Sequence, residues 1–169
     1  IETMKKAAEK GALCLNYMEV ESFIYNDGKI IGAELTDMLA GENIVVHAEK
    51  IVNATGPWVD DVREKDEISN LKSLTLAKGV HIVLDRSVFP LRQAIYFDAP
   101  DGRMIFAIPR GQKAYIGTTD TYYDDDCLNP NATEEDLAYL LDAVRSMFPK
   151  THFRRRHIES TGAGIRPLV

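Results

Sequence analysis

Residues 51–60 read Ile51-Val52-Asn53-Ala54-Thr55-Gly56-Pro57-Trp58-Val59-Asp60, in which two branched apolar residues lead into a run of small ones. This pattern favours a strand over Ile51–Ala54 and a Gly-Pro turn into a short helix, whose positive end suits Asp60 and Asp61. The small side chains of residues 54–56 allow a large flat ligand to lie directly on the backbone. A buried strand followed by a tight turn fits the same pattern.

The composition is that of a soluble globular protein, with 45% hydrophobic and 27% charged residues. No apolar run approaches the roughly 20 residues that span a bilayer, and no signal segment opens the chain. The chain begins in mid-helix and stops without a tail, so we expect a piece of a longer protein. We expect that protein to be cytoplasmic.

Charge and residue spacing argue against binding of nucleic acid or metal, and the cysteines indicate the redox compartment. The formal net charge is −6, which argues against binding nucleic acid, and the basic run at 150–157 is best explained as a solvated face. Cys14 and Cys127 are far apart and lack metal-ligand neighbours, which indicates a reducing compartment. The acidic residues 122–126 lack the oxygen spacing of a calcium loop, so we expect no metal.

Residues 1–70 predict a helix end followed by an antiparallel β-meander. The Asn26-Asp27-Gly28 sequence is a strong hairpin signal between two of its strands. Because a sheet of only three strands is marginally stable by itself, we expect this meander to pack on a larger sheet. The expected segments are the helix over Glu2–Gly11 and the extended stretches Leu13–Tyr17, Val20–Tyr25, Lys29–Thr36 and Ile44–Ala48.

Residues 71–169 predict a second domain, separated from the first within the charged segment 60–70. We expect an antiparallel sheet with one covered face and a helix over Thr133–Phe148, which Thr133 and Asp136 open as a capping box. The fold class is therefore α+β. The expected strands are Lys78–Leu84, Ala94–Phe97, Met104–Ile108, Ala114–Thr118 and His157–Ser160, and the helical apolar stripe is Leu137, Leu140, Leu141, Val144, Met147 and Phe148.

Two residues of this second domain are candidates for chemistry. Arg166 lies between Gly164 and Pro167, where the proline favours an extended backbone and a guanidinium suits bidentate capture of a phosphate or carboxylate. His81 shares a strand face with Gly79, and a histidine near neutrality can accept a proton from a hydroxyl. Structural roles remain open for both: an arginine paired with a local carboxylate, and a core histidine.

Two further segments carry polar groups beside these residues. Lys78 precedes Gly79 at the start of the predicted strand and would add positive charge there. Gly117-Thr118-Thr119-Asp120 closes another strand, and its hydroxyls and carboxylate suit a polyol or phosphate, although taken alone the segment is better explained as a turn cap.

The order of these motifs resembles the FAD-dependent glycerol-3-phosphate dehydrogenase and oxidase family, within the D-amino-acid oxidase-like superfamily. The likeness runs from about Ile51 to the end, and the preceding meander is compatible with it. The motifs that carry it are residues 51–59, 78–83, 101–109, 117–120 and 164–168.

The resemblance implies a role for each motif. Ala54, Thr55, Gly56, Trp58 and Gly164 would contact FAD. Lys78, His81, Thr118 and Arg166 would line the substrate cavity, with Arg166 holding the phosphate and His81 the candidate base. The reaction would move a hydride from C2 of sn-glycerol 3-phosphate to the flavin, giving dihydroxyacetone phosphate, and a quinone or oxygen would reoxidise the flavin.

The resemblance also sets limits and leaves alternatives. The glycine-rich dinucleotide fingerprint is absent, so residues 1–70 would be a partial FAD-binding domain and 71–169 a truncated substrate-binding domain. We expect the chain alone to be inactive and colourless, and the sequence leaves open whether its parent makes a peripheral membrane contact. The alternatives are an amino-acid or glycine oxidase, in which Arg166 would hold a carboxylate, and a non-catalytic α+β binding module.

Overall fold

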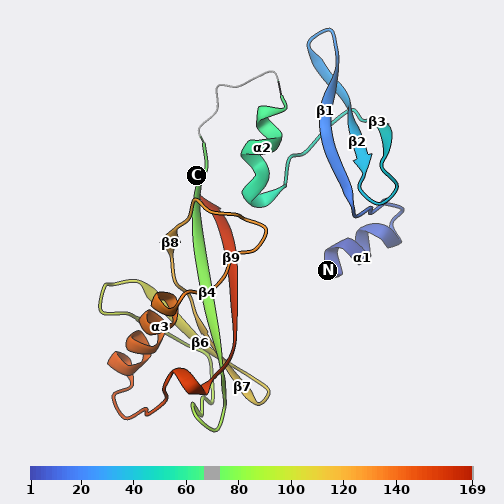
Figure 1. The fold of residues 1–169 in the computed structure, drawn as a ribbon. Coiled ribbons are helices and arrows are strands. Elements are labelled where there is room, and N and C mark those ends of the chain that lie inside the picture. The colour runs from blue at the N-terminus through green and yellow to red at the C-terminus, as the bar shows by residue number, and fades with distance from the viewer. Residues whose placement is uncertain (67–72, 169) are drawn as a thin grey trace. The chain divides into compact units, whose positions relative to one another are not determined.

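The structure is a computed structural model that describes residues 1–66 and 73–168. The chain divides into two compact units, residues 1–71 and 72–169 (Figure 1). Both contain helices and antiparallel sheet, so the predicted α+β class is confirmed. The end of the predicted boundary segment, beyond residue 66, lies outside the described residues.

The first unit is built around a three-stranded antiparallel meander in the order β1-β2-β3. Its hairpin turn contains Asp27 and Gly28 with φ angles of 49° and 72°, the left-handed values that an Asp-Gly hairpin turn requires. The predicted meander is therefore confirmed. The elements are α1 (Glu2–Glu9), β1 (Met18–Asn26), β2 (Lys29–Asp37), β3 (Glu42–His47), η1 (Gly56–Trp58) and α2 (Val59–Glu64).

Two extended segments predicted in this unit are wrong. Leu13–Tyr17 forms no strand, and its leucines Leu13 and Leu15 are exposed. Ile51–Ala54 likewise joins no ladder among the described residues, and the Val52 side chain is 83% exposed. Apolar β-branched residues favour a strand only where a neighbouring strand and a packed face are available, and within the described part of this unit neither is available here.

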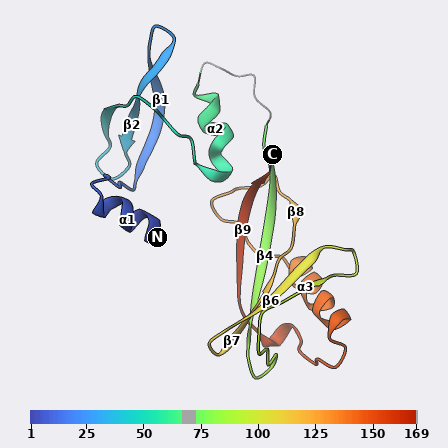
Figure 2. The same cartoon turned by 180° about the vertical axis from the view of Figure 1, so that it is seen from behind.

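The second unit is an antiparallel sheet in which β4 is central. One side of β4 pairs with β7 and β8, the other side pairs with β9, and β6 and β5 continue the sheet beyond β7. Figures 1 and 2 show β4 and β9 running side by side along most of their length. The elements are β4 (Thr75–Asp85), β5 (Ile95–Asp98), β6 (Met104–Arg110), β7 (Lys113–Gly117), β8 (Thr121–Tyr122), α3 (Glu134–Met147), η2 (Arg155–His157) and β9 (Ile158–Leu168).

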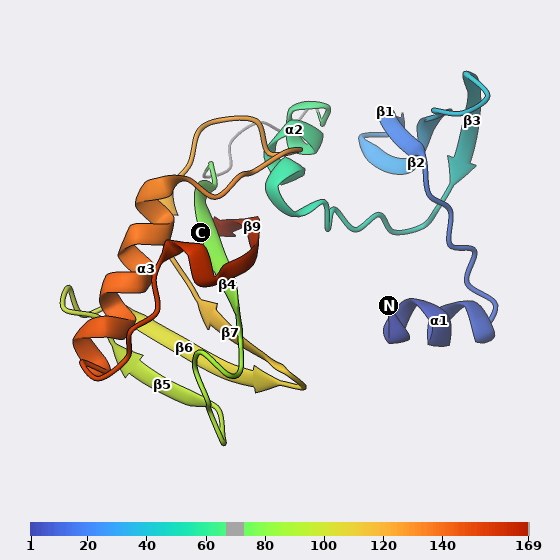
Figure 3. The ribbon, with the colours of Figure 1, turned by 60° about the horizontal axis from the view of Figure 1, so that its bottom comes forward.

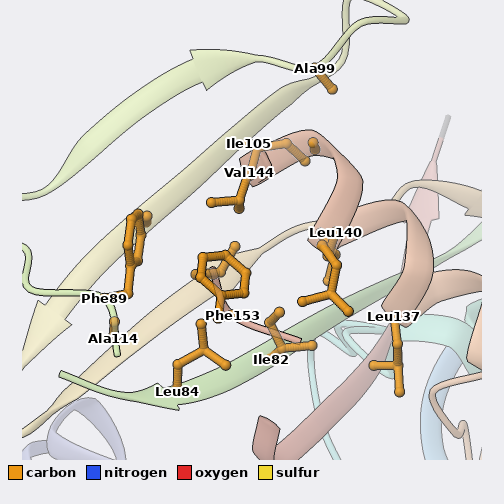
Figure 4. Close-up of a cluster of buried hydrophobic side chains, with 14 of the residues drawn as sticks. Ile82, Leu84, Phe89, Ala99, Ile105, Ala114, Leu137, Leu140, Val144 and Phe153 are labelled. Atoms are coloured by element: carbon orange, nitrogen blue, oxygen red, sulfur yellow. The ribbon is translucent and has the colours of Figure 1, made fainter. Parts of the chain in front are cut away.

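Helix α3 covers one face of this sheet and encloses the core (Figure 3). Every second residue of β4 points to the helix, so Val80, Ile82 and Leu84 are fully buried. The predicted apolar stripe of α3 packs against them, with the exception of Met147, which is 52% exposed because it lies in the last turn of the helix. Figure 4 shows the cluster between helix and sheet, with Phe153 at its centre.

Strand β9 is longer than predicted. The sequence pattern predicted a strand only over His157–Ser160, because the following glycines and Pro167 disfavour strands. In the structure β9 runs from Ile158 to Leu168 and pairs with β4 along its length, with Gly162 opposite His81 and Gly164 opposite Gly79. None of the described helices is long and apolar enough to cross a membrane.

The capping box of α3 is confirmed. Asp136 N–H donates to Thr133 Oγ1 at 3.2 Å, and Thr133 N–H donates to Asp136 Oδ2 at 2.9 Å. Burial alone would raise the pKa of Asp136, but hydrogen bonds from Lys78 and Thr133 bring it below its ordinary value. The start of the helix is therefore fixed by both its cap and a charged contact from β4.

Replacing Thr133 with Ala removes both bonds of its hydroxyl. We predict that the free energy of unfolding falls by about 1 kcal/mol, the usual cost of losing an N-cap side chain. Urea unfolding followed by circular dichroism measures this change. Tryptophan fluorescence would not, because the only tryptophan, Trp58, lies in the first unit. Ser146→Ala, on the exposed side of the same helix, is the control and should change the stability by no more than about 0.5 kcal/mol.

Candidate functional site

The face of the second unit's sheet that α3 does not cover carries an open cleft. Strand alternation places Gly79 and His81 of β4 on this face, opposite the buried Val80 and Ile82. On β9, Gly162 and Gly164 lie directly beside them. The cleft has a volume of about 340 Å³ and is lined by Gly79, His81, Gly162, Ala163, Gly164, Ile165 and Arg166.

The imidazole of His81 lies over Gly117 of the neighbouring strand β7. A Cβ atom at Gly117 would overlap the His81 ring, so the imidazole occupies space that only a glycine leaves. The ring of Phe106, on the next strand, is 5.4 Å from the imidazole centroid to centroid. Gly117 and Phe106 therefore fix where the half-buried imidazole lies.

The guanidinium of Arg166 is held at the same face. Its Nη2 donates to the Thr119 carbonyl and to Asp120 Oδ1, both at 2.9 Å. A Cβ atom at Gly79 would lie 2.9 Å from Arg166 Nη2 and 2.8 Å from Thr118 Oγ1. Gly79 thus lets both groups approach the β4 backbone.

His81 and Arg166 influence each other electrostatically. Burial disfavours the charged imidazolium, and the positive charge of Arg166 disfavours it further, so the pKa of His81 lies below its ordinary value of 6.5. His81 is therefore neutral at pH 7 and can accept a proton. Because the unfolded chain binds this proton more readily, the free energy of unfolding falls as the pH drops from 6.5 through the lower pKa of the folded state.

Of the residues predicted to line the substrate cavity, the structure brings together His81, Arg166 and Thr118, but not Lys78. Gly164, predicted as a cofactor contact, lines the same cleft. The Lys78 ammonium lies on the helix-covered side, where it forms an ion pair with Asp136 Oδ2 at 2.8 Å and donates to the Asn131 carbonyl at 3.2 Å. Only 10% of its side chain is exposed. The sequence prediction thus placed Lys78 on the wrong face of β4.

The corner at residues 53–59 of the first unit is organised by Asn53, which the sequence analysis overlooked. Its Nδ2 donates to the Val59 carbonyl at 2.9 Å, and its Oδ1 accepts from Thr55 Oγ1 at 2.7 Å. Gly56 adopts a φ of +61°, which favours glycine. Ala54 and Thr55 are exposed, and the Thr55 N–H donates to Asn53 Oδ1 at 3.3 Å.

Trp58, which was predicted to lie near the cofactor, belongs to this corner and is 39% exposed. The predicted cofactor residues therefore fall into two groups: Ala54, Thr55, Gly56 and Trp58 in the first unit, and Gly164 in the second. Each group has accessible backbone: a Cβ atom at Gly56 or at Gly164 would meet nothing within 4 Å.

Asp120 is a second residue whose contact the sequence analysis did not identify. The Gly-Thr-Thr-Asp segment suggested a turn cap or a ligand contact, whereas the structure directs Asp120 Oδ1 to Arg166. These residues are 46 positions apart, and only the pairing of β9 with β4 brings them together.

Comparison with known proteins identifies the family. The FAD dependent oxidoreductase family, abbreviated DAO, matches residues 2–169, and the chain belongs to it. The aerobic glycerol-3-phosphate dehydrogenases of Staphylococcus haemolyticus (strain JCSC1435) and Staphylococcus aureus (strain USA300) are each 55% identical over 171 residues, which is 100% of this chain and 31% of the relative. The chain thus spans about a third of their length, and the family resemblance drawn from the sequence is confirmed.

Solved structures agree with this placement. The glycerol-3-phosphate dehydrogenase from Bacillus halodurans, complexed with FAD, superposes with a TM-score of 0.91 at 55% identity, covering 99% of this chain and 34% of that one. The L-proline dehydrogenase from P. horikoshii superposes with a TM-score of 0.67 at 18% identity, over 95% of this chain and 40% of that chain. The second similarity concerns the fold alone.

Replacing Arg166 with Gln removes the positive charge beside His81. We predict that the pKa of His81 rises but stays below 6.5, because burial still disfavours the imidazolium. NMR titration of the imidazole, assigned through His81→Gln, measures the change. Arg92→Gln, at an exposed position, is the control and should leave the titration as in the wild type. An unchanged midpoint in Arg166→Gln would contradict the electrostatic contact.

Replacing Gly79 with Ala forces Arg166 away from the β4 backbone. Because the crowded atoms are the ends of mobile side chains, we predict little loss of stability but a rise in the pKa of His81, as in Arg166→Gln. Gly164→Ala, directly across the ladder, is the matched control, since its Cβ meets nothing within 4 Å. Equal titration curves for the two variants would show that Gly79 does not make room for the guanidinium.

Proposed function

We propose that the chain is part of a flavoenzyme that oxidises sn-glycerol 3-phosphate to dihydroxyacetone phosphate, with FAD as hydride acceptor. The observation that carries the proposal is the position of Arg166 and His81 on one open face of the sheet, with Thr118 between strands beside them. The names of relatives at 55% identity support it. Residues 1–70 then belong to the cofactor domain, and 71–169 to the substrate domain.

The residues present fit a flavin. Gly162 and Gly164 form a bare strip of β9 backbone in which added Cβ atoms would meet nothing within 4 Å, so a planar ring system can lie against it. In the first unit, the exposed, small Ala54 and Thr55 and the left-handed Gly56 suit contact with the nucleotide part. FAD, when bound, supplies the acceptor for the hydride that leaves C2 of the substrate.

Arg166 binds the substrate phosphate in this proposal. Its Nη2 is occupied by Thr119 and Asp120, while Nε and Nη1 form no hydrogen bond within the described residues, so the N–H groups of these two nitrogens are available to an oxyanion. An arginine suits this task better than a lysine because its donors are fixed in one plane. The guanidinium thus fixes one end of the substrate.

His81 accepts the proton of the C2 hydroxyl. Its lowered pKa keeps the imidazole neutral at pH 7, as a general base requires, and Phe106 and Gly117 restrict its orientation. Thr118 Oγ1, beside Gly79, can hydrogen-bond a second polar group of a polyol. Together these residues orient the substrate and remove a proton, and they leave the redox step to the cofactor.

Substituting Arg166 in the full-length enzyme tests the phosphate assignment. We predict that Arg166→Lys lowers kcat/KM for glycerol 3-phosphate by about tenfold or more, because a flexible point charge cannot hold both the Thr119 and Asp120 contacts and the substrate as the planar guanidinium does. Steady-state assays with glycerol 3-phosphate, glycine and a D-amino acid measure this, and Arg92→Lys is the control. Oxidation of an amino acid but not of glycerol 3-phosphate would overturn the proposal.

Assays of the same enzyme with a quinone and with oxygen identify the electron acceptor. Sedimentation with lipid vesicles tests whether the enzyme makes a peripheral membrane contact. Neither result bears on the roles of Arg166 and His81, because both residues act before the electrons leave the cofactor.

A further inference from the structure

Asp120 forms the only ion pair that the described residues offer Arg166. Its Oδ1 lies 2.9 Å from Arg166 Nη2, and the same nitrogen donates to the neighbouring Thr119 carbonyl. The side chains of Arg166 and Asp120 are 42% and 52% exposed, so the pair is accessible to solvent and to a ligand. Two acceptors on consecutive residues therefore hold a single corner of the guanidinium.

The backbone that carries Asp120 is itself fixed. Thr119 is 1% exposed, and its Oγ1 accepts the Val80 N–H of β4 at 2.9 Å. On the other side, Arg103 Nη1 donates to the Asp120 carbonyl at 3.2 Å. Because a buried anchor and a side-chain contact hold residues 119 and 120, the carboxylate extends from a rigid base.

Arg103 is in turn tied to α3. Its guanidinium forms an ion pair with Asp101 at 2.6 Å and lies 4.1 Å from the centroid of the Tyr139 ring. Tyr139 OH also donates to Asp101 Oδ1 at 3.2 Å. A chain of contacts thus connects the helix on one face of the sheet, through Arg103 and Asp120, to the guanidinium on the other.

The position of these contacts determines which N–H donors of Arg166 are free. Both acceptors use Nη2, Gly79 lies beneath the guanidinium, and Nε and Nη1 carry no hydrogen bond within the described residues. We propose that Asp120 is a positioning residue, which fixes the guanidinium of Arg166 at Nη2 so that its remaining N–H donors, on Nε and Nη1, are held ready for the oxyanion of the substrate. This inference rests on the proposed function of the same cleft and assigns Asp120 no contact with the substrate.

A positioning role and a purely electrostatic role of Asp120 predict opposite effects when this side chain is removed. If Asp120 acted only through its charge, its removal would leave Arg166 in place with a positive charge that no carboxylate partly neutralises. The cleft would then bind an anion more tightly, and His81 would be harder to protonate. If Asp120 positions Arg166, its removal frees the guanidinium to leave the β4 backbone. Anion binding then weakens, and His81 becomes easier to protonate.

The experiment compares Asp120→Ala and Asp120→Asn with the wild-type chain, with inorganic phosphate as the probe. NMR titration gives both the phosphate Kd and the pKa of His81. We expect Asp120→Ala to raise the Kd by about threefold to fivefold, the scale of an exposed ion pair, and to raise the pKa of His81. Asp120→Asn keeps an acceptor oxygen and should recover part of both effects.

Asp124→Asn is the matched control, because it removes the same charge from an exposed position just beyond β8 that forms no ion pair with Arg166 among the described residues. It should leave both readouts within error of the wild type. Amide spectra of all variants establish that each is folded, and Asp120→Asn preserves the shape of the side chain if Asp120→Ala disturbs it.

The outcomes separate this inference from the function on which it rests. Tighter phosphate binding or a lowered pKa of His81 in Asp120→Ala would overturn the positioning role, as would no change. If phosphate binding is lost in Arg166→Gln but unaffected in Asp120→Ala, only the positioning role fails. If wild type and Arg166→Gln bind phosphate equally, the anion assignment of the cleft fails, and the inference fails with it.

Discussion

The pairing of β4 with β9 is the contact on which the rest of the second unit depends. Along this ladder Ala77 lies opposite Arg166, Gly79 opposite Gly164, and His81 opposite Gly162. The alternation of β4 places Val80 and Ile82 in the core beneath α3 on one side and His81 over the cleft on the other. A slip of one residue would exchange the two faces, burying His81 and exposing the core, so register and site are specified together.

Glycines on this face leave space for the side chains of the candidate site. Gly79 admits the guanidinium of Arg166, and Gly117 admits the imidazole of His81, because a Cβ at either position would crowd those groups. Gly162 and Gly164 leave a flat backbone surface beside them. Glycine in a strand normally weakens it, and here the extensive pairing of β4 and β9 and the core beneath offset that cost.

Local patterns were sufficient for the regular elements but not for contacts across the sheet. Apolar spacing and the Thr133–Asp136 cap predict α3, and the Asp27-Gly28 turn predicts the hairpin, because these signals act over a few residues. The length of β9 depended on a partner strand far away in sequence. Ile51 and Val52 form the converse case, since a strand-like pattern without a partner stays outside the sheet.

The same limit applies to the candidate site. The sequence was enough to select His81 and Arg166 as candidates, and strand alternation should have placed Lys78 on the opposite face from His81, since the two are three positions apart. Asp136, the partner of Lys78, is 58 positions away, and Asp120, the partner of Arg166, is 46 positions away. Such pairs are brought together by the order in which strands and helix pack, and local sequence patterns do not reveal that order.

The buried contact between Lys78 and Asp136 has a consequence for how this family changes over time. Both side chains are almost entirely enclosed, at 10% and 5% exposure, and removing one partner would leave an isolated charge in a low-dielectric interior. An apolar replacement of both is far less costly than a replacement of either. Relatives should therefore keep or lose these two residues as a pair, so that covariation between the strand and the helix records an electrostatic constraint inherited separately from the catalytic one.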